Sequence, residues 1–178
     1  MLTAVDGEAI TYDAIGDSTT TYAMDFFYDA SGYPFAVKYN GDLCYYITNL
    51  QGDVMSIVDA QGEVVAEYEY DPYGNIVSQS GPLAEVNPLR YRGYVYDTES
   101  TLYYLQSRYY DPSLGRFLNA DALYSTDQSI LSNDMFAYCR NDPVSRVDPT
   151  GLKDYIYTSS TEYYVEDDWG FWDFLNAD

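Results

Sequence analysis

Apolar and polar residues alternate with a period of two along much of the first half of the chain. Such alternation is typical of a β-strand with one buried face. Shorter apolar runs over 43–48 and 54–58 have the length and composition of buried strands. We therefore predict a mostly β protein. The clearest alternating run places Val64, Ala66, Tyr68 and Tyr70 on one face and Glu67, Glu69 and Asp71 on the other.

One turn signal recurs between these strands: an Asp or Asn is followed three residues later by Gly. This spacing fits a type I turn, because the side-chain oxygen caps the turn and Gly accepts the left-handed conformation. Asn40-Gly41 adds a two-residue hairpin signal. The pattern predicts an antiparallel meander of hairpins. Its five units are Asp13–Gly16, Asp29–Gly32, Asn49–Gly52, Asp59–Gly62 and Asp71–Gly74.

The pattern changes after residue 78. Residues 79–88 are typical of a connecting loop, and strands are predicted to resume over 89–97 and 102–111. The two-residue period is then lost, and we predict a short helical segment near 127–139. The end of the chain is acidic and aromatic and lacks the turn signal. The sequence thus predicts three segments, 1–88, 89–152 and a tail over 153–178.

Length and charge limit the classes of protein to which the chain can belong. Its 178 residues suffice for one domain with a real core. Its net charge of −21 opposes binding to nucleic acid or to an anionic membrane. No apolar run approaches the roughly 18 residues of a membrane span, and residues 1–7 do not resemble a signal peptide. We expect no nucleic-acid partner and no membrane span.

The chain has no histidine, which excludes Ser-His and Cys-His catalysis and removes the commonest metal ligand. Cys44 and Cys139 have neither a metal-binding spacing nor a disulfide framework, so we expect two buried free thiols. Residues 59–63 do not fit the register of a calcium loop. We therefore expect no metal and no cofactor. Any catalysis must use carboxylates, tyrosines, hydroxyls or arginines.

Six of the eight basic residues fall between residues 89 and 152, and all six are arginines. Arginine pairs with carboxylates in a planar, two-bonded geometry. The clustering therefore indicates either ion pairing inside a polar site or salt bridges between neighbouring strands at the surface. The arginines are Arg90, Arg92, Arg108, Arg116, Arg140 and Arg146, and the nearby aspartates are Asp111, Asp121, Asp142 and Asp148.

Two sets of motifs resemble a known family. The units around Phe27-Tyr28-Asp29 and Glu69-Tyr70-Asp71 resemble YD (tyrosine-aspartate) repeats. The second set resembles the RHS repeat-associated core domain, and repeats and core together cover about residues 12–152. Its motifs are Leu89-Arg-Tyr-Arg-Gly-Tyr94, Gln106-Ser-Arg-Tyr-Tyr-Asp-Pro-Ser-Leu-Gly-Arg-Phe117 and Phe136-Ala-Tyr-Cys-Arg-Asn-Asp-Pro-Val-Ser-Arg-Val-Asp-Pro-Thr-Gly-Leu152.

The resemblance implies a fold and a set of partners. In this family, YD repeats spiral into a hollow β-shell around a toxic C-terminal segment, and the core domain caps the shell. The chain would be an open fragment of such an RHS β-shell. Its partners would be its own C-terminal tail and the upstream YD-repeat shell or another protein. The resemblance also suggests a bacterial protein that is secreted or displayed at the cell surface.

The resemblance further implies an aspartyl autoprotease, as in several members of the family. The implied acids are Asp121 and Asp148, with Arg108 as the supporting cation, and the cut would fall between Leu152 and Lys153. Two adjacent carboxylates suit this chemistry, because one keeps a proton and the pair then offers an acid and a base together. The remaining motif residues carried over are Pro149, Gly151 and Arg116.

Other functions fit the same residues. The run Asp148-Pro-Thr-Gly151 has the spacing of the five turns, and Asp71-Pro-Tyr-Gly74 nearly repeats it, so Asp148 could be one more turn cap. The chain would then be a non-catalytic structural or interaction module, or a truncated orphan without toxin activity. A third hypothesis is a surface adhesin or a carbohydrate binder that uses exposed tyrosines, although 23 tyrosines in strands more often lie in the core or pair across the sheet.

Overall fold

The computed structural model describes residues 10–15, 21–30, 32–121 and 134–156, and the statements below concern these residues. The chain divides into two compact units, Met1–Thr101 and Leu102–Asp178. Regular structure in the described residues consists of strands and two short 3-10 turns. The mostly β, antiparallel fold predicted from the alternation is confirmed.

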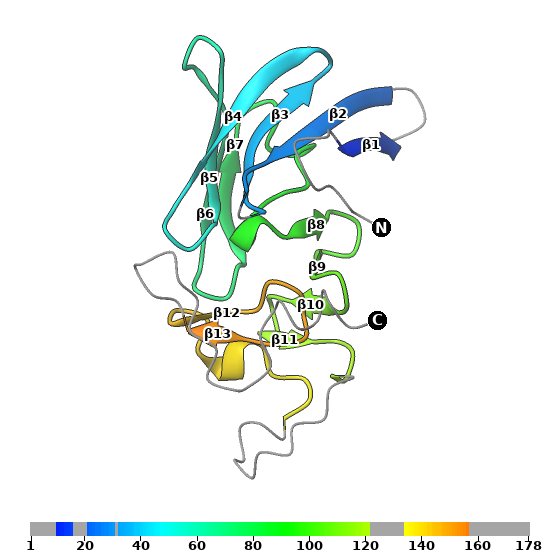
Figure 1. The fold of residues 1–178 in the computed structure, drawn as a ribbon, viewed down its shortest axis with the longest axis vertical. Helices are drawn as coiled ribbons and strands as arrows, with labels where there is room; N and C mark the ends of the chain where they lie inside the picture. The colour runs from blue at the N-terminus through cyan, green and yellow to red at the C-terminus, as the bar shows by residue number, and fades with distance from the viewer. Residues whose placement is uncertain (1–9, 16–20, 31, 122–133, 157–178) are drawn as a thin grey trace. The chain divides into compact units, whose positions relative to one another are not determined.

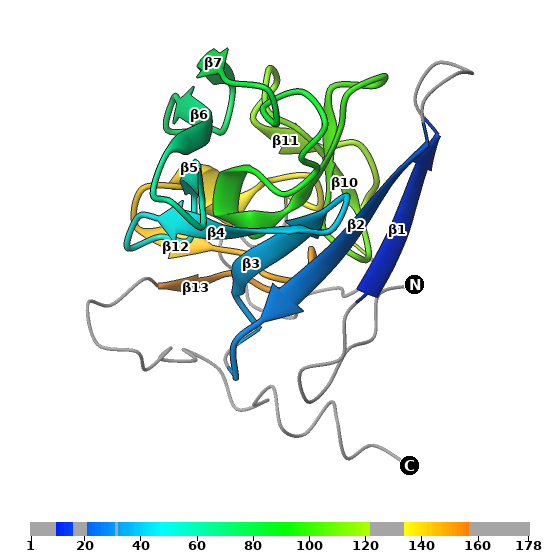
Figure 2. The same cartoon turned by 90° about the horizontal axis from the view of Figure 1, so that it is seen from above.

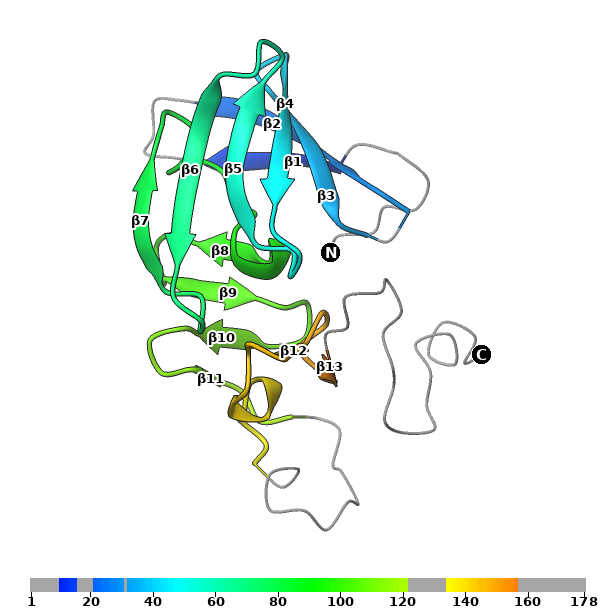
Figure 3. The same ribbon diagram turned by 90° about the vertical axis from the view of Figure 1, so that its left-hand side faces the viewer.

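The first unit contains a seven-stranded sheet in which each strand pairs antiparallel with the next along the chain (Figure 1). Figure 3 shows β4 to β7 of this meander as neighbouring arrows that alternate in direction. The strands are β1 (Ile10–Ile15), β2 (Thr21–Tyr28), β3 (Pro34–Tyr39), β4 (Asp42–Thr48), β5 (Val54–Asp59), β6 (Val64–Tyr70) and β7 (Ile76–Ser80).

The predicted turns connect these strands. In each turn, the Gly N–H donates a hydrogen bond to the backbone carbonyl of the Asp or Asn that begins the turn. The N–H of the residue after Gly donates to the side-chain oxygen of that same Asp or Asn. Asn40 and Gly41 have φ of 50° and 102°, as a two-residue hairpin turn requires. The turns at Asn49, Asp59 and Asp71 lie wholly within the described residues, and the Asp29 turn does so except for residue 31. The predicted Asp13–Gly16 turn extends outside the described residues.

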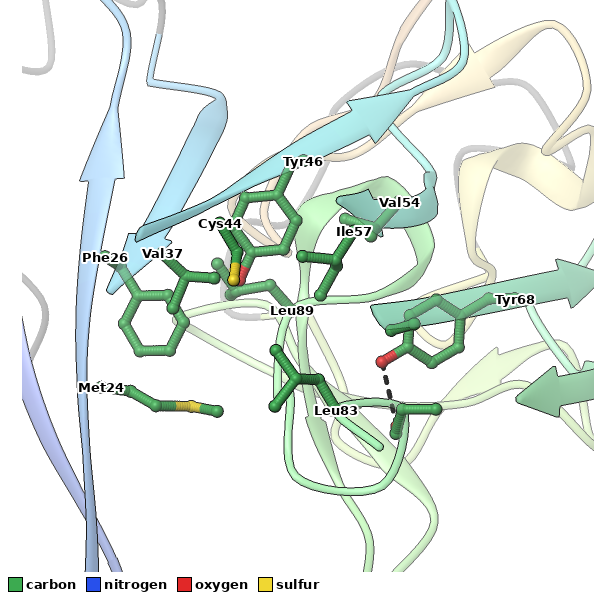
Figure 4. Close-up of a cluster of buried hydrophobic side chains, with 12 residues drawn as sticks. Met24, Phe26, Val37, Cys44, Tyr46, Val54, Ile57, Tyr68, Leu83 and Leu89 are labelled. Carbon is green, nitrogen blue, oxygen red and sulfur yellow. Dashed lines mark hydrogen bonds between the residues drawn. The ribbon is translucent and has the colours of Figure 1, made fainter. Parts of the chain in front are cut away.

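Bulges adjust which side chains face the core of the first unit. Ile47 pairs with Ser56 and Thr48 pairs with Val54, so Met55 is an extra residue in β5. An extra residue shifts the alternation by one position. As a result, Val54 and Ile57, three residues apart, are both fully buried. Figure 4 shows both side chains pointing into the core cluster together with Phe26, Val37, Tyr46 and Tyr68.

The segment 81–94 covers the concave side of this sheet (Figure 2). Leu83 and Leu89 complete the apolar cluster, as the close-up shows. Buried Asn87 accepts a hydrogen bond from the Tyr46 hydroxyl, 2.7 Å, and Arg90 donates to backbone carbonyls of this segment. The run 89–97, predicted as one strand, instead folds back at a 3-10 turn, η1 (Tyr91–Gly93), because two residues there have positive φ. Leu89 consequently pairs with Val95, the first residue of β8 (Val95–Asp97).

The second unit contains two small antiparallel sheets. In the first, β10 (Tyr109–Asp111) pairs with both β9 (Leu102–Tyr104) and β11 (Arg116–Phe117), and in the second, β12 (Arg146–Val147) pairs with β13 (Tyr155–Ile156). The prediction of one strand over 102–111 is wrong, because Gln106, with φ of 65°, turns the chain between β9 and β10. This turn carries Arg108 at its end.

The helical segment predicted near 127–139 falls largely outside the described residues. Its described end, 134–138, forms turns and a bridge, and a 3-10 turn, η2 (Cys139–Asn141), follows. The three segments predicted from the motifs, 1–88, 89–152 and 153–178, stay a prediction, because sequence motifs and packing units need not share boundaries. Both cysteines are free and buried.

Candidate active site

The structure brings Arg108, Asp121 and Asp148 together in the second unit. The Arg108 guanidinium lies at the centre, and the Arg108 side chain is only 5% exposed. Its Nη2 is 3.1 Å from Oδ2 of Asp121 and 3.4 Å from Oδ2 of Asp148. Because both oxygens contact the same nitrogen, they are no more than about 6.5 Å apart. Hydrogen bonds of up to about 3.2 Å let one water molecule bridge two oxygens that are up to about 6.4 Å apart, a limit close to this upper bound.

The other nitrogens of Arg108 bind backbone. Its Nε donates to the carbonyl of Gly151, and its Nη1 donates to the carbonyl of Met135 at 3.1 Å. The guanidinium carbon stacks over the ring of Phe117, 3.6 Å from the ring centroid. A stacked guanidinium is held in plane and partly desolvated, which strengthens its interaction with nearby carboxylates. Arg108 therefore links three chain segments that lie far apart in the sequence.

Asp148 caps the turn formed by residues 148–151. Its Oδ1 accepts hydrogen bonds from the N–H of Gly151, 2.7 Å, and from the N–H of Leu152, 3.1 Å. The turn packs closely on the loop before β10: Ser107 donates from its hydroxyl to the Thr150 carbonyl, 2.7 Å. A Cβ on Gly151 would lie 2.8 Å from that hydroxyl oxygen, and the φ of Gly151 is +73°. Only glycine fits this position without strain.

Burial raises the pKa of the Asp148 carboxyl to about 7, even though Arg108 and the backbone N–H donors lower it. Asp154 raises the same pKa further through its negative charge. Desolvation is the largest cause, because the side chain is almost fully buried and a charged carboxylate loses its hydration there. The Asp148 carboxyl therefore keeps its proton to a higher pH than an ordinary aspartic acid does.

Asp121 approaches Arg108 from another segment. Its N–H donates to the Met135 carbonyl, 2.9 Å, the same oxygen that Arg108 binds. Its side chain is more exposed than that of Asp148, at 18% against 3%. The pair thus joins one buried carboxyl that holds a proton near neutral pH with one carboxylate that water can reach. This asymmetry is the arrangement from which one acid and one base arise.

The bond between Leu152 and Lys153 lies in the loop that connects β12 to β13. Val147 pairs with Tyr155 at the base of this loop, so both of its ends are held. Pro149 lies inside the Asp148 turn. Arg116 is not part of the group formed by Arg108, Asp121 and Asp148. Its guanidinium forms a partly exposed ion pair with Asp134 at 2.6 Å.

Sequence reasoning missed two partners of Arg108. The carbonyl of Met135 carries no side-chain signal, and Phe117 was visible only as the last residue of the Arg-Phe motif. Below Phe117, the rings of Tyr110 and Tyr138 pack at 4.1 Å between centroids and are fully buried. Both rings also pack against Phe117, and they therefore support the ring on which the Arg108 guanidinium stacks.

Within the described part of the chain, no group of three or more His, Cys, Asp or Glu residues is placed to hold a metal ion. In the same residues, no helix has the length and apolar character to cross a bilayer.

Comparison with known proteins relates the chain to YD-repeat proteins. It is 36% identical over 147 residues to the tRNA nuclease WapA of Bacillus subtilis, a match that covers 82% of this chain and 6% of that protein. It is 27% identical over 126 residues to Teneurin-m of Drosophila melanogaster, covering 68% of this chain and 4% of that protein. The chain thus spans only a small fraction of these relatives.

Solved structures agree with this relationship. The crystal structure of TcdB2-TccC3 without its hypervariable C-terminal region matches with a TM-score of 0.63 and 28% identity, over 76% of this chain and 7% of that one. The family described as Teneurin YD-shell matches residues 10–144. The chain therefore belongs to the Teneurin YD-shell family and is an RHS/YD-repeat protein.

Proposed function

We propose that the chain is the terminal part of an RHS/YD-repeat shell that holds its own C-terminal segment and releases it by aspartyl self-cleavage after Leu152. The observation that carries this proposal is the shared guanidinium: Arg108 contacts Asp121, Asp148 and the Gly151 carbonyl at once. The two carboxylates and the backbone just before the bond are thereby held in one place.

The site divides the chemical roles by environment. Asp121, the more exposed carboxylate, takes a proton from a water molecule as the water oxygen adds to the Leu152 carbonyl carbon. Asp148, which holds a proton near neutral pH, gives it to the departing nitrogen of Lys153, and the C–N bond breaks. The products are a carboxylate on Leu152 and an amine on Lys153. Proton exchange with solvent then restores both acids.

Arg108 has two tasks in this scheme. It holds the Asp121 carboxylate in place at 3.1 Å, and it fixes the Gly151 carbonyl, so that the following peptide is presented in one orientation. Because the substrate is part of the same chain, the reaction is intramolecular. Intramolecular positioning removes much of the entropic barrier that a separate peptide would meet.

The comparisons support the release of a variable tail. The related crystal structure is described as lacking a hypervariable C-terminal region, and the WapA relatives are described as tRNA nucleases. In this chain, composition changes after Leu152 to an acidic, aromatic tail. Since the chain matches only 6% of WapA, its upstream partner would be further YD repeats of a larger shell.

The test is the intact mass of the full chain after purification, followed from pH 4 to pH 8. We expect two fragments that separate at Leu152, and an uncut chain for Asp148→Asn and for Asp121→Asn. The matched control is Asp71→Asn, which alters the same Asp-Pro-x-Gly sequence in the first unit and should cut like the natural chain. A natural chain that stays whole throughout this pH range would contradict the proposal.

A non-catalytic structural role is the second candidate. It is favoured by Oδ1 of Asp148, which satisfies two N–H groups of its own turn as an ordinary turn cap does. Under this reading the chain remains uncut, and Arg108 serves only to neutralise two carboxylates. Intact mass therefore separates the two candidates directly.

A further inference from the structure

Asp154, which has no role in the proposed cleavage chemistry, forms ion pairs with two arginines. Its Oδ2 is 2.6 Å from Nη1 of Arg146, and its Oδ1 is 3.3 Å from Nε of Arg140. All three side chains are at least partly buried, with exposed fractions of 16% for Asp154, 15% for Arg146 and 30% for Arg140. Two cations on one carboxylate at such burial make a stronger contact than an ordinary surface pair.

The backbone around Arg140 is strained into this contact. Cys139, Arg140 and Asn141 all have positive φ, at 50°, 51° and 62°. Residues other than glycine rarely adopt this conformation, and three in succession require support from their surroundings. The support includes backbone hydrogen bonds from Asn141 to Tyr138 and from Asp142 to Cys139, both 2.9 Å. The fold therefore maintains an unusual turn at the point where Arg140 reaches Asp154.

The contact lies close in the sequence to the proposed cleavage site. Asp154 is the second residue after the Leu152–Lys153 bond, and it directly precedes β13, whose Tyr155 pairs with Val147. The residues before the bond are held separately, by Arg108 on the Gly151 carbonyl and by Asp148 on the Leu152 N–H. The bond is thus fixed from both sides by different groups.

We propose that Arg140 and Arg146 form a carboxylate-binding subsite that fixes the leaving side of the Leu152–Lys153 bond, with Asp154 as its positioning residue. The role in cleavage rests on the proposed function, whereas the subsite itself does not. An anchored leaving side keeps the Lys153 nitrogen within reach of the acid and reduces the motion that must be frozen in the transition state. The subsite selects an acidic side chain at this position of the tail.

Two readouts separate the subsite from the reaction. The first is amide hydrogen exchange of residues 153–156 in full-length Asp121→Asn, a background in which cleavage is not expected. Replacing Asp154 with Asn should accelerate this exchange about tenfold or more, because the carboxylate no longer binds two guanidiniums. Asp154→Glu keeps the charge and should preserve most of the protection. The control Asp142→Asn removes an exposed carboxylate nearby and should change nothing.

The second readout is the rate of self-cleavage in the otherwise natural chain. Asp154→Asn should slow cleavage about tenfold, Asp154→Glu should restore most of the rate, and Asp142→Asn should match the natural chain. The pH profile provides a signature that a purely structural role would not move. Arg108, Asp154 and Tyr155 face Asp148, and Asp121 shares the Arg108 nitrogen. Losing the negative charge of Asp154 should shift the alkaline limb of the profile to lower pH.

The outcomes distinguish this inference from the proposed function. Unchanged exchange in Asp154→Asn would overturn the subsite, whether or not the chain cuts. Faster exchange with an unchanged cleavage rate would overturn the positioning role. If the natural chain never cuts, self-cleavage fails, and the exchange experiment alone decides whether the carboxylate subsite exists.

Discussion

Two turns in this chain have nearly the same sequence and different surroundings. At Asp71-Pro-Tyr-Gly74, Oδ1 of Asp71 caps the turn and Oδ2 accepts a hydrogen bond from the neutral amide of Asn75 at 2.7 Å. At Asp148-Pro-Thr-Gly151, Oδ1 again caps the turn, but Oδ2 faces the Arg108 guanidinium at 3.4 Å. Asp71 is partly exposed, whereas Asp148 is 2% exposed.

The turn motif therefore determines the backbone geometry, whereas the surrounding fold determines which group contacts the second carboxylate oxygen. One carboxylate oxygen is used locally in both turns, because a type I turn leaves backbone N–H groups that need an acceptor. The second oxygen is free to take what the surroundings offer. In the repeat it meets a side chain four residues away, and in the core it meets a cation 40 residues away. Function is expected only where the second oxygen has a charged and buried partner.

Removing that cation should have the largest effect. Arg108→Met should destabilise the chain by about 3–5 kcal/mol, because two carboxylates and two carbonyls lose a buried partner. It should also abolish cleavage. Arg116→Met provides the control, since its ion pair with Asp134 is partly exposed and should contribute less than about 1 kcal/mol. Urea unfolding measures both variants, and similar losses from the two would contradict the central role of Arg108.

The next largest effect is a pH dependence at Asp148. Its pKa is raised in the folded state, so its contribution to stability is full at low pH and is lost as pH rises toward about 7. Asp148→Asn removes the buried charge and keeps the Oδ1 acceptor. We compare the free energy of unfolding of the double variant, Asp121→Asn with Asp148→Asn, with that of Asp121→Asn alone. The difference in favour of the double variant should increase by about 3 kcal/mol from pH 4 to pH 8.

The same comparison at Asp71 sharpens this result. Asp71→Asn in the same background is the comparison, because the Asp71 carboxylate is only partly buried. Equal pH dependence for the two substitutions would mean that burial does not distinguish the turns. Urea unfolding at the two pH values makes both measurements.

Much of the fold could be predicted from local chemistry, and the site could be predicted only through motifs. The Asp71 and Asn40 turns followed from their residue types, because Asp, Asn and Gly decide turn geometry locally. The turn at Gln106, which separates β9 from β10, could not be predicted from the sequence. A positive φ at Gln arises from tertiary packing rather than from propensity. That turn positions Arg108. The resemblance alone selected Arg108, Asp121 and Asp148, and it gave no indication of Asp154, whose partners converge only in three dimensions.

Glycine substitutions should have a smaller effect. Gly151→Ala combines a positive φ with a Cβ only 2.8 Å from the Ser107 hydroxyl oxygen, and should cost about 2 kcal/mol and slow cleavage. In the repeat, Gly62→Ala meets no atom within 4 Å and should cost only the backbone strain, about 1 kcal/mol, without affecting cleavage. Thermal unfolding and intact mass measure the two effects. A cleavage rate that is equal in both variants would show that the Asp148 turn need not be tightly packed.

The smallest effect should come from Asp71→Asn at neutral pH. Asparagine retains an oxygen that can cap the turn through the N–H groups of Tyr73 and Asn75, so the backbone geometry should persist. The loss is confined to the second oxygen, because an amide NH2 then faces the Nδ2 of Asn75 where a carboxylate oxygen accepted a hydrogen bond. We expect a loss of about 0.5–1 kcal/mol in the free energy of unfolding, the value of one partly exposed hydrogen bond. If Asp71→Asn instead destabilises the chain as much as Arg108→Met does, the second oxygen of the repeat turn matters as much as that of the core. The distinction between the two turns would then be wrong.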